Sequence, residues 1–373
     1  MRATTAILIG LLVATTPLCA SPPSPAALRE RLDRILADPC LRGVDVGVCV
    51  AKVTGTALYE QHADAALMPA SNMKLVTAAT VLRTWGDGYA FPTALYADAR
   101  PDQRGAIVGN LYLKGLAHPV LDRGFIVRAA QRLYREGLRA ITGTVVCAGP
   151  VTCEPHPDPE LRDAKALFLA LNRLGVVINR PASVGEVPPQ AILLHRWQSE
   201  TTGELVRDMN KRSDNTIADG FAQSLRYHHA AAGSYDAFVK DVWRPLGLPL
   251  DGCRFVDGSG LSRQNRLTPR FLVQLLQVAY ADELLRPNFL DALPVAGVDG
   301  TLRLRMQGTC AAGTVRAKTG FLTGVSTLSG YIPCNGEVLC FSIMMNNHRY
   351  GAGPMRDIQN RACVTMVEWL EGG

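Results

Sequence analysis

The chain has 373 residues, of which 47% are hydrophobic and 19% are charged, a composition typical of a globular protein with one large core and a smaller attached unit. Its formal net charge of +6 is spread along the chain without a block of consecutive basic residues, and aromatic residues make up only 6%. This pattern excludes a nucleic-acid-binding arm or stacking platform, and it supports only a mild affinity for an anionic polymer.

The first twenty residues have the order of an export signal. Arg2 precedes a short apolar run over residues 6–14, and Ala20 precedes a polar, proline-rich stretch. We therefore predict a signal peptide over residues 1–20, cleaved after Ala20, and a periplasmic protein. A retained membrane anchor is the less favoured alternative, because the run is too short for a span and no later segment reaches about 18 apolar residues. Lipidation at Cys19 is disfavoured because Leu18 stands where such sites have Gly or Ala.

Nine of the ten cysteines follow Ala20, which suits an oxidising compartment. We expect a disulfide between Cys147 and Cys153, which flank a proline-containing turn, and an odd number of cysteines leaves at least one unpaired. No Cys/His cluster has the spacing of a zinc site, so we expect neither a metal nor another cofactor.

Amphipathic patterns open the chain. Apolar residues at helical spacing predict a helix over residues 25–37, and the alternating valines from Val44 to Val50 predict a half-buried strand. A run rich in Leu, Val, Ala and Met predicts a further helix from Ser71 to Trp85.

The sequence pattern changes over residues 97–154, a region rich in Gly and Pro. Strand-like pieces at residues 107–114 and 143–147 flank a predicted helix over residues 123–135. Helical periodicity resumes over residues 159–174, so we expect the main domain to restart there.

The chain closes with two predicted strands, over residues 326–332 and 337–345, joined through Asn335-Gly336 as a hairpin, and a last helix over residues 358–369. Both ends of the chain are therefore expected to build one antiparallel sheet covered by helices, with a helical lobe from the middle of the chain. The predicted fold class is α+β, with a main domain over residues 21–96 and 156–373 and a small inserted α/β subdomain over residues 97–155.

Ser71 and Lys74 lie three residues apart at the start of a predicted helix, so their side chains share one face. A serine hydroxyl needs a base, and a desolvated lysine near other cations can have its pKa lowered enough to serve. Backbone N–H groups at the helix start can stabilise an oxyanion. By itself the short Ser-x-x-Lys pattern is more often a helix cap beside a solvated lysine.

Ser213-Asp214-Asn215 lies between two predicted helices, where a loop can present a hydroxyl and an amide to a cleft. Taken alone, such a tripeptide is more often an ordinary turn or helix start.

Lys318-Thr319-Gly320 comes just before the first strand of the predicted terminal hairpin. A strand edge with Lys and a hydroxyl can hold a carboxylate and pair with an extended peptide, and Gly320 would allow close approach. The commoner reason for a lysine there is protection of a sheet edge.

The three triplets occur in the order found in class A β-lactamases and penicillin-binding proteins. Longer segments over residues 69–75, 209–215, 257–269 and 295–302 extend the likeness. The chain thus resembles the class C penicillin-binding proteins, the D-alanyl-D-alanine carboxypeptidase/endopeptidase family of the penicillin-binding protein 4 type, over nearly all of the mature chain outside the middle. The resemblance implies the penicillin-recognising serine transpeptidase/β-lactamase-like fold.

The resemblance implies an acyl transfer on peptidoglycan peptides that end in D-Ala-D-Ala. Ser71 would be the nucleophile and Lys74 its base, and Ser213, helped by Lys318, would relay the proton to the leaving amine. Penicillins would trap the same Ser71.

The resemblance also implies the binding residues. Asn215 would hold the acyl side chain, and Lys318, Thr319 and Gly320 would line the groove for the terminal carboxylate. The backbone N–H groups of Ser71 and Phe321 would form the oxyanion hole.

Three features depart from the family pattern. Phe321 replaces a usual Thr, Ala117-His118-Pro119 replaces Gly-Asp-Pro, and Ser71 and Ser213 are only 142 positions apart (213 minus 71). The missing residues fall between Cys153 and Asp158. These departures put the preference among wall peptides in doubt rather than catalysis.

Two alternatives remain. A secreted β-lactamase of class A would need a Glu-x-x-Leu-Asn pattern, which the sequence around Glu283 does not fit. A catalytically silent wall-binding module would keep the fold without the chemistry.

Overall fold

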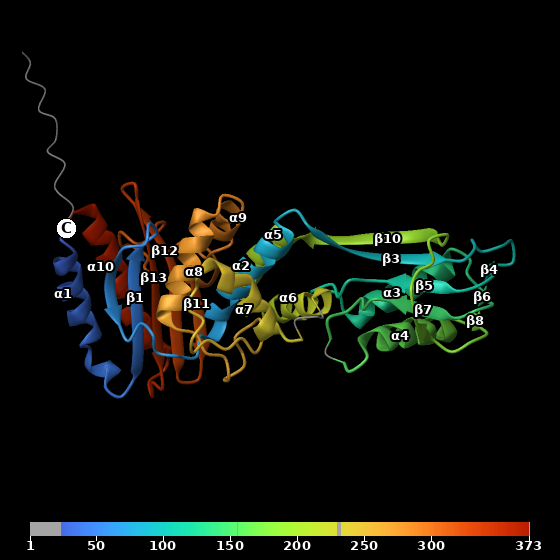
Figure 1. The fold of residues 1–373 in the computed structure, drawn as a ribbon, viewed down its shortest axis with the longest axis horizontal. Helices are drawn as coiled ribbons and strands as arrows, with labels where there is room; N and C mark the ends of the chain where they lie inside the picture. Colours follow the sequence, from blue (N-terminus) through green and yellow to red (C-terminus); the bar gives the residue numbers. More distant parts are fainter. Residues whose placement is uncertain (1–23, 155, 230–232, 373) are drawn as a thin grey trace, which may run out of the picture.

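The computed structural model describes residues 24–154, 156–229 and 233–372, so the predicted signal peptide over residues 1–20 lies outside the described residues. The molecule is elongated, with a sheet domain at one end, a group of helices in the middle and a small lobe at the other end (Figure 1). The site described below lies where the sheet meets the middle helices.

The sheet of the main domain has five antiparallel strands in the order β11-β12-β13-β1-β2. The strands are β1 (Asp45–Lys52), β2 (Ala57–Gln61), β11 (Arg316–Leu322), β12 (Val325–Cys334) and β13 (Glu337–Asn346). Strand β1 pairs directly with β13, so the two ends of the chain build one sheet, as the sequence predicted.

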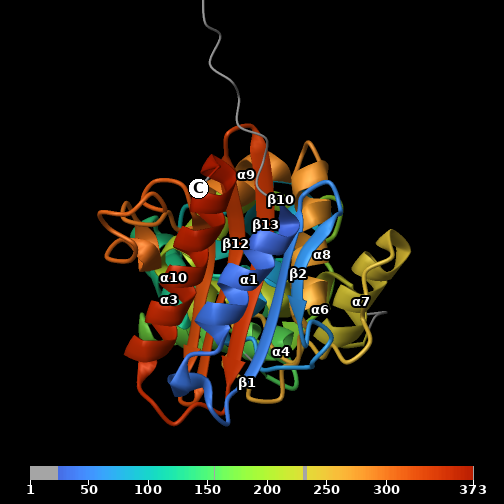
Figure 2. The ribbon, with the colours of Figure 1, turned by 90° about the vertical axis from the view of Figure 1, so that its left-hand side faces the viewer.

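Two helices cover one face of this sheet, and a third covers the other (Figure 2). Helices α1 (Pro25–Leu36) and α10 (Ala352–Glu371) pack together on the outer face, while α8 (Pro269–Ala281) packs on β1 and β13. Helix α1 begins where predicted because Ser24 accepts a hydrogen bond from Ala27 N and Pro25 occupies the first turn. The apolar faces of these helices therefore fix both sides of the sheet.

The middle layer is a group of helices built around α2 (Met73–Trp85), whose residues 73–82 are all buried. Its neighbours are α5 (Thr202–Arg212), α6 (Asn215–His228), α7 (Tyr235–Trp243) and α9 (Arg286–Asp291). Short 3₁₀ turns complete the main domain: η1 (Pro39–Leu41), η2 (Ala70–Asn72), η4 (Arg244–Leu246) and η5 (Gly300–Leu302). The first ten residues of α2 are therefore enclosed by the core, and the turn η2 leads directly into them.

The small lobe contains two sheets, in the orders β10-β3-β5-β7-β9 and β4-β6-β8, with two helices packed on them. Its elements are β3 (Ala90–Ala97), β4 (Ala106–Ile107), β5 (Leu111–Lys114), α3 (Arg123–Arg135), β6 (Ala140–Ile141), β7 (Val145–Ala148), α4 (Pro159–Arg173), β8 (Val177–Ile178), β9 (Ser183–Val184) and β10 (Ile192–Thr201). Long strands β3 and β10 join it to the helical layer (Figure 1).

The packing of the lobe differs from the predicted boundaries of the inserted subdomain. We expected the main domain to resume at residue 156, but α4 packs into the core of the lobe against α3 and β7. The chain returns to the main domain only along β10, which pairs with β3. A helical pattern shows that a face is buried but not against which partner, and this is why the expected boundary at residue 155 was too early.

The nine described cysteines are all free in the structure, so the predicted bridge between Cys147 and Cys153 is wrong. Cys147 Sγ donates to Gly149 O, whereas Cys153 Sγ donates to Ala117 O and lies 3.3 Å from Ser224 Oγ. The two thiols flank the turn but face different partners. Burial also raises the pKa of the Cys153 thiol to about 12, which leaves little of the reactive thiolate.

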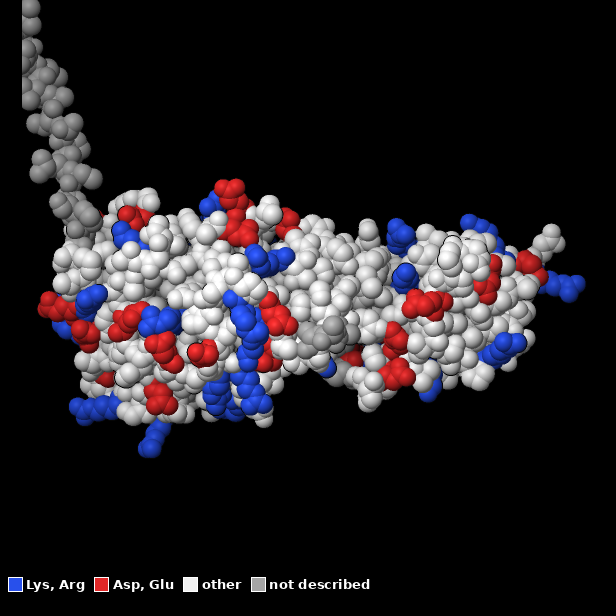
Figure 3. Space-filling view, in the orientation of Figure 1, with Lys and Arg blue, Asp and Glu red and all other residues white. Residues whose placement is uncertain are grey.

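Basic and acidic side chains are interspersed over most of the face shown in Figure 3. Within the described residues no helix is long and apolar enough to cross a bilayer, and no cluster of three or more His, Cys, Asp or Glu side chains is arranged to hold a metal.

Candidate active site

Ser71 lies in the 3₁₀ turn η2, just before α2, rather than at the first residue of the helix as predicted. The preceding Ala70 has a left-handed backbone with φ of 45°, a conformation that non-glycine residues rarely adopt. Thr327 Oγ1 on β12 donates to Pro69 O at 2.8 Å and anchors the turn to the sheet. Strained backbone held by such anchors is common at functional sites, and here it sets the position of Ser71.

Lys74 is fully buried, and its amine makes three hydrogen bonds. Its Nζ donates to Ser71 Oγ at 3.1 Å, to Asn215 Oδ1 at 2.7 Å and to Ser259 O at 2.8 Å. Desolvation lowers the pKa of Lys74 to about 8, against the opposing influence of Asp219, Asp257 and Asp214. A lysine with this pKa exchanges its proton near neutral pH, as a base for Ser71 requires.

Ser213 and Lys318 form the second pair of the site. Lys318 is fully buried, and its Nζ donates to Ser213 Oγ at 2.8 Å and to Thr319 O at 2.9 Å. Burial lowers the pKa of Lys318 well below its usual value, and the charge on Lys74 acts in the same direction. The charge on Lys74 affects the pKa of Lys318, so the two amines lie near each other. The Ser71–Lys74 pair and the Ser213–Lys318 pair therefore belong to one site.

Ser213 ends α5 with a left-handed backbone, φ 58°, and Asp214 caps the next helix by accepting from Ile217 N. Asn215 is therefore the first residue of α6 and points back to Lys74. With Oδ1 accepting from Lys74, the amide Nδ2 is the group that Asn215 can offer to a ligand. The tight connection between α5 and α6 places both side chains in one cleft.

Lys318, Thr319 and Gly320 lie within β11, the edge strand of the sheet, and not just before the first strand as predicted. An edge strand leaves one row of backbone groups free to pair with an extended peptide. The Phe321 side chain is half exposed beyond this triplet.

Gly320 has a structural reason to be glycine that the sequence did not reveal. A Cβ at this position would overlap Thr327 Oγ1 and would lie 2.8 Å from Pro69 O. The absence of a side chain thus lets β11 lie against the turn that carries Ser71.

The loop over residues 257–260 contributes a contact that sequence reasoning missed, the carbonyl of Ser259 on Lys74. Asp219 Oδ1 accepts from Gly258 N at 3.1 Å and from Ser259 N at 2.9 Å, which holds this carbonyl in place. Gly260 has φ of 87°, and a Cβ there would overlap Ala70 O. The resemblance over residues 257–269 was the available signal, but a backbone acceptor leaves no side-chain pattern.

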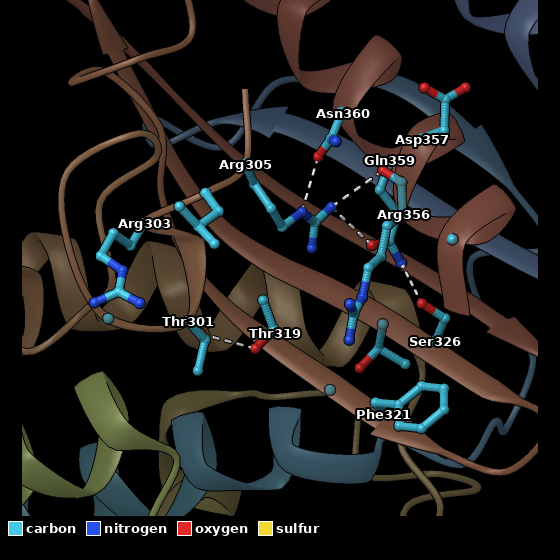
Figure 4. Close-up of a pocket in the computed structure, with 15 residues that line it drawn as sticks. Thr301, Arg303, Arg305, Thr319, Phe321, Ser326, Arg356, Asp357, Gln359 and Asn360 are labelled. Atoms are coloured by element: carbon cyan, nitrogen blue, oxygen red, sulfur yellow. Dashed lines mark hydrogen bonds between the residues drawn. The ribbon is translucent and has the colours of Figure 1, made fainter. Parts of the chain in front are cut away.

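Thr319 makes a second contact that sequence reasoning missed. Its Oγ1 donates to Thr301 Oγ1 at 2.9 Å, and both residues line a pocket of about 580 Å³ between β11, η5 and α10 (Figure 4). The pocket therefore opens beside the strand that carries the Lys-Thr-Gly triplet.

The site brings together two hydroxyls, two buried amines and an amide from three separate parts of the chain. A hydroxyl next to an amine of lowered pKa is an activated nucleophile, and a second hydroxyl next to a second amine can pass a proton to a leaving group. This arrangement suits acyl transfer through a covalent serine ester.

Comparison with known proteins places the chain in a family. The sequence profile of the D-Ala-D-Ala carboxypeptidase 3 (S13) family matches residues 28–149 and 156–370. The break in the match overlaps the stretch between Cys153 and Asp158 where the sequence indicated missing residues.

Curated relatives agree with this match. A D-alanyl-D-alanine carboxypeptidase of Actinomadura sp. (strain R39) is 29% identical, covering 92% of this chain and 85% of the relative. The carboxypeptidase DacB of Mycolicibacterium smegmatis is 31% identical, covering 92% of this chain and 84% of the relative.

Solved structures show the same fold. Penicillin-binding protein 4 of Haemophilus influenzae, in complex with a β-lactam, superposes with a TM-score of 0.73 at 20% identity, covering 90% of this chain and 99% of that chain. A penicillin G-acylated predatory endopeptidase of Bdellovibrio bacteriovorus superposes with a TM-score of 0.61 at 18% identity, covering 87% of this chain and 93% of that chain. The predicted α+β, penicillin-recognising fold and the predicted family are confirmed. The chain belongs to the D-Ala-D-Ala carboxypeptidase 3 (S13) family and is a hydrolase of that type.

Proposed function

We propose that this protein is a serine D-alanyl-D-alanine carboxypeptidase that cleaves the stem peptides of peptidoglycan through an acyl-enzyme on Ser71. The family match supports the reaction, and the sequence of the first twenty residues supports a periplasmic location. Penicillins are proposed to acylate Ser71 because they mimic the terminal dipeptide.

Acylation begins with Ser71 Oγ attacking the carbonyl carbon between the two terminal D-alanines. The hydroxyl proton passes to the neutral form of Lys74, whose Nζ lies 3.1 Å from Ser71 Oγ. With a pKa of about 8, roughly a tenth of Lys74 is neutral at about pH 7. The backbone N–H groups of Ser71 and Phe321 are proposed to stabilise the oxyanion.

The C–N bond then breaks, and the leaving amine takes a proton from the Ser213 hydroxyl, which Lys318 Nζ contacts at 2.8 Å. Free D-alanine departs and leaves the peptide esterified to Ser71. The proton that Lys74 took from Ser71 passes on to the Ser213 oxygen, which restores the Ser213 hydroxyl and returns Lys74 to its neutral form. Water then attacks the ester carbonyl and gives a proton to Lys74, and as the ester C–O bond breaks Lys74 returns that proton to Ser71 Oγ, which restores the hydroxyl and releases the peptide as a free acid. Asn215 holds the acyl side chain, and Thr319 with Gly320 accommodates the terminal carboxylate.

One observation carries the proposal: a fully buried Lys74 with a pKa lowered to about 8 contacts Ser71 Oγ directly. A lysine that only balanced surface charge would keep its amine in water. The same route cuts a cross-linked peptide when the leaving amine belongs to a second stem, so endopeptidase activity is part of the proposal.

The test is labelling of the mature protein with a fluorescent penicillin, together with assays of D-alanine release and of cross-link cleavage. We expect a stable adduct and D-alanine release, both lost in Ser71→Ala. Ser183→Ala is the matched control, because Ser183 lies on β9, which pairs with β7 in the sheet of the small lobe. Absence of both an adduct and D-alanine release in the unaltered protein would favour a silent wall-binding module.

Rapid turnover of the penicillin would favour a β-lactamase instead. Glu283, the glutamate considered for a β-lactamase deacylation step, is exposed in the turn between α8 and α9 and does not belong to the site described above. We therefore expect the penicillin ester to persist.

A further inference from the structure

The pocket beside Thr319 is lined by three arginines, Arg303, Arg305 and Arg356 (Figure 4). The acidic side chain in its lining, Asp357, is paired with Arg361 at 3.0 Å. The pocket is therefore positively charged, and it is continuous with the Lys-Thr-Gly strand through Thr319 and Gly320.

Within the described chain, none of these three arginines forms an ion pair. Arg305 donates to neutral acceptors: Asn360 Oδ1 at 2.9 Å, Gln359 Oε1 at 3.1 Å and the carbonyl of Arg356 at 3.3 Å. Desolvation lowers the pKa of Arg305 to about 10, so it remains charged at neutral pH. A partly buried cation without a counter-ion is favourable to an incoming anion.

Arg356 is the arginine that contacts Phe321, the residue that follows the Lys-Thr-Gly triplet. Its guanidinium carbon lies 5.8 Å from the centre of the Phe321 ring, and in Figure 4 the group extends from α10 toward Thr319 and Phe321. A cation over an aromatic face is weakly attracted, so the ring orients the arginine without neutralising its charge.

The other groups near Thr319 cannot supply this charge. Lys318 is fully buried, with its amine held by Ser213 and by Thr319 O. Phe321 has no side-chain donor, and Thr319 Oγ1 is a neutral hydroxyl bound to Thr301. Of the groups compared here, Arg356 is therefore the cation that can bind an anionic group of a ligand beside Thr319.

We propose that Arg356, oriented by Phe321, binds the terminal carboxylate of the substrate on the leaving-group side, while Arg303 and Arg305 supply the positive potential of the pocket. This proposal rests on the function proposed above, because it needs a substrate that ends in a carboxylate beside Thr319. Arg356 is thus a specificity-determining residue that distinguishes free carboxyl ends from neutral ends.

The test compares a short D-Ala-D-Ala peptide with the same peptide carrying a C-terminal amide, and a penicillin with its methyl ester. For each pair the discrimination is the ratio of the two second-order acylation rates. We expect Arg356→Gln to lower this ratio about tenfold or more, because a charge-assisted contact is lost only for the carboxylate. Phe321→Leu should lower it less, since the arginine stays but loses its orienting ring.

The matched control is Arg180→Gln, which removes the same charge from an exposed position of the small lobe and should leave the ratio unchanged. Binding of both peptides to the Ser71→Ala protein gives a readout without turnover, and its affinity ratio should fall in the Ser71→Ala/Arg356→Gln double variant. An unchanged ratio in Arg356→Gln, or an equal loss for acid and amide, would overturn the role of Arg356. If instead the unaltered protein forms no adduct and binds neither peptide, both this proposal and the proposed function fail.

Discussion

Lys318 Nζ donates to Ser213 Oγ at 2.8 Å, although the two residues belong to an edge strand and to the end of a helix. Ser213 reaches this position with a left-handed backbone, φ 58°, which directs its hydroxyl at the amine. Burial and the charge of Lys74 lower the pKa of Lys318, so the pair is suited to proton exchange. The geometry therefore places the Ser213 hydroxyl and the Lys318 amine in direct contact, as the proposed proton relay requires.

Replacing Ser213 by alanine should slow acylation by peptide substrates about 100-fold or more, because the leaving amine loses its proton donor. The measurement is the rate of D-alanine release, with circular dichroism to show that the fold persists. The Lys318→Met/Ser213→Ala double variant should lose little more than either single variant, since both act in one transfer. Independent, multiplying losses would contradict a shared role.

The pH dependence of acylation should follow Lys74. Its pKa is lowered to about 8, and the neutral form is the proposed base, so the rate should rise with pH and level off above about pH 8. Below that value the protonated amine donates to Ser71 Oγ and cannot take its proton. Adduct formation with a labelled penicillin, followed from about pH 5 to about pH 10, gives the inflection.

The inflection should move to lower pH in Asp219→Asn. The Asp219 carboxylate opposes the desolvation of Lys74, so removing its charge lowers the pKa of Lys74 further. Asparagine keeps an oxygen that can accept from Gly258 N and Ser259 N, so the loop should hold its shape. Asp241→Asn, on the exposed side of α7, serves as the control, and a shift equal to that of the control would exclude the electrostatic role of Asp219.

Much of the fold could be predicted because its signals are local. The helix over residues 123–135 was predicted with the bounds found for α3, since Asp122 caps its first turn and Gly137 follows its end. The return along β10 was not predicted, because its pairing with β3 joins residues about a hundred positions apart and none of its side chains is fully buried.

The site shows the same division. Its five polar side chains were predicted because each stands in a recognisable triplet. The contact of the Ser259 carbonyl was not predicted, because a backbone acceptor leaves no signature in the sequence. The position of Arg356 was not predicted either, because only the folded chain brings this arginine next to Phe321.

Gly320→Ala should reduce both stability and acylation. The new Cβ would overlap Thr327 Oγ1 and press on Pro69 O, which displaces the turn that carries Ser71. Overpacking of this kind costs about 2 kcal/mol of unfolding free energy. Gly88→Ala is the control, since nothing lies within 4 Å of a Cβ there. Thermal unfolding and penicillin labelling measure the two effects, and a Gly320→Ala protein that labels at the normal rate would show that this contact does not position Ser71.

The docking of the small lobe on the main domain depends on a second close contact, at Gly220 within α6. Alanine in place of glycine usually stabilises an exposed helix by about 1 kcal/mol. At Gly220, however, the added Cβ would overlap Pro119 O, which belongs to the loop that joins β5 to α3. Gly220→Ala should therefore lower the melting temperature and make the junction between the lobes more accessible to a protease.

Gly353→Ala is the matched control for this change, because it also lies in a helix but has no atom within 4 Å of the added Cβ. It should leave the melting temperature unchanged or raise it slightly. If Gly220→Ala has the same effect on the melting temperature as Gly353→Ala, then α6 can move away from the Pro119 carbonyl with little loss of stability. The small lobe would then not be held by this contact. If only Gly220→Ala is destabilised, the glycine is there because the two lobes meet backbone to backbone, which is a packing requirement and not a matter of helix propensity.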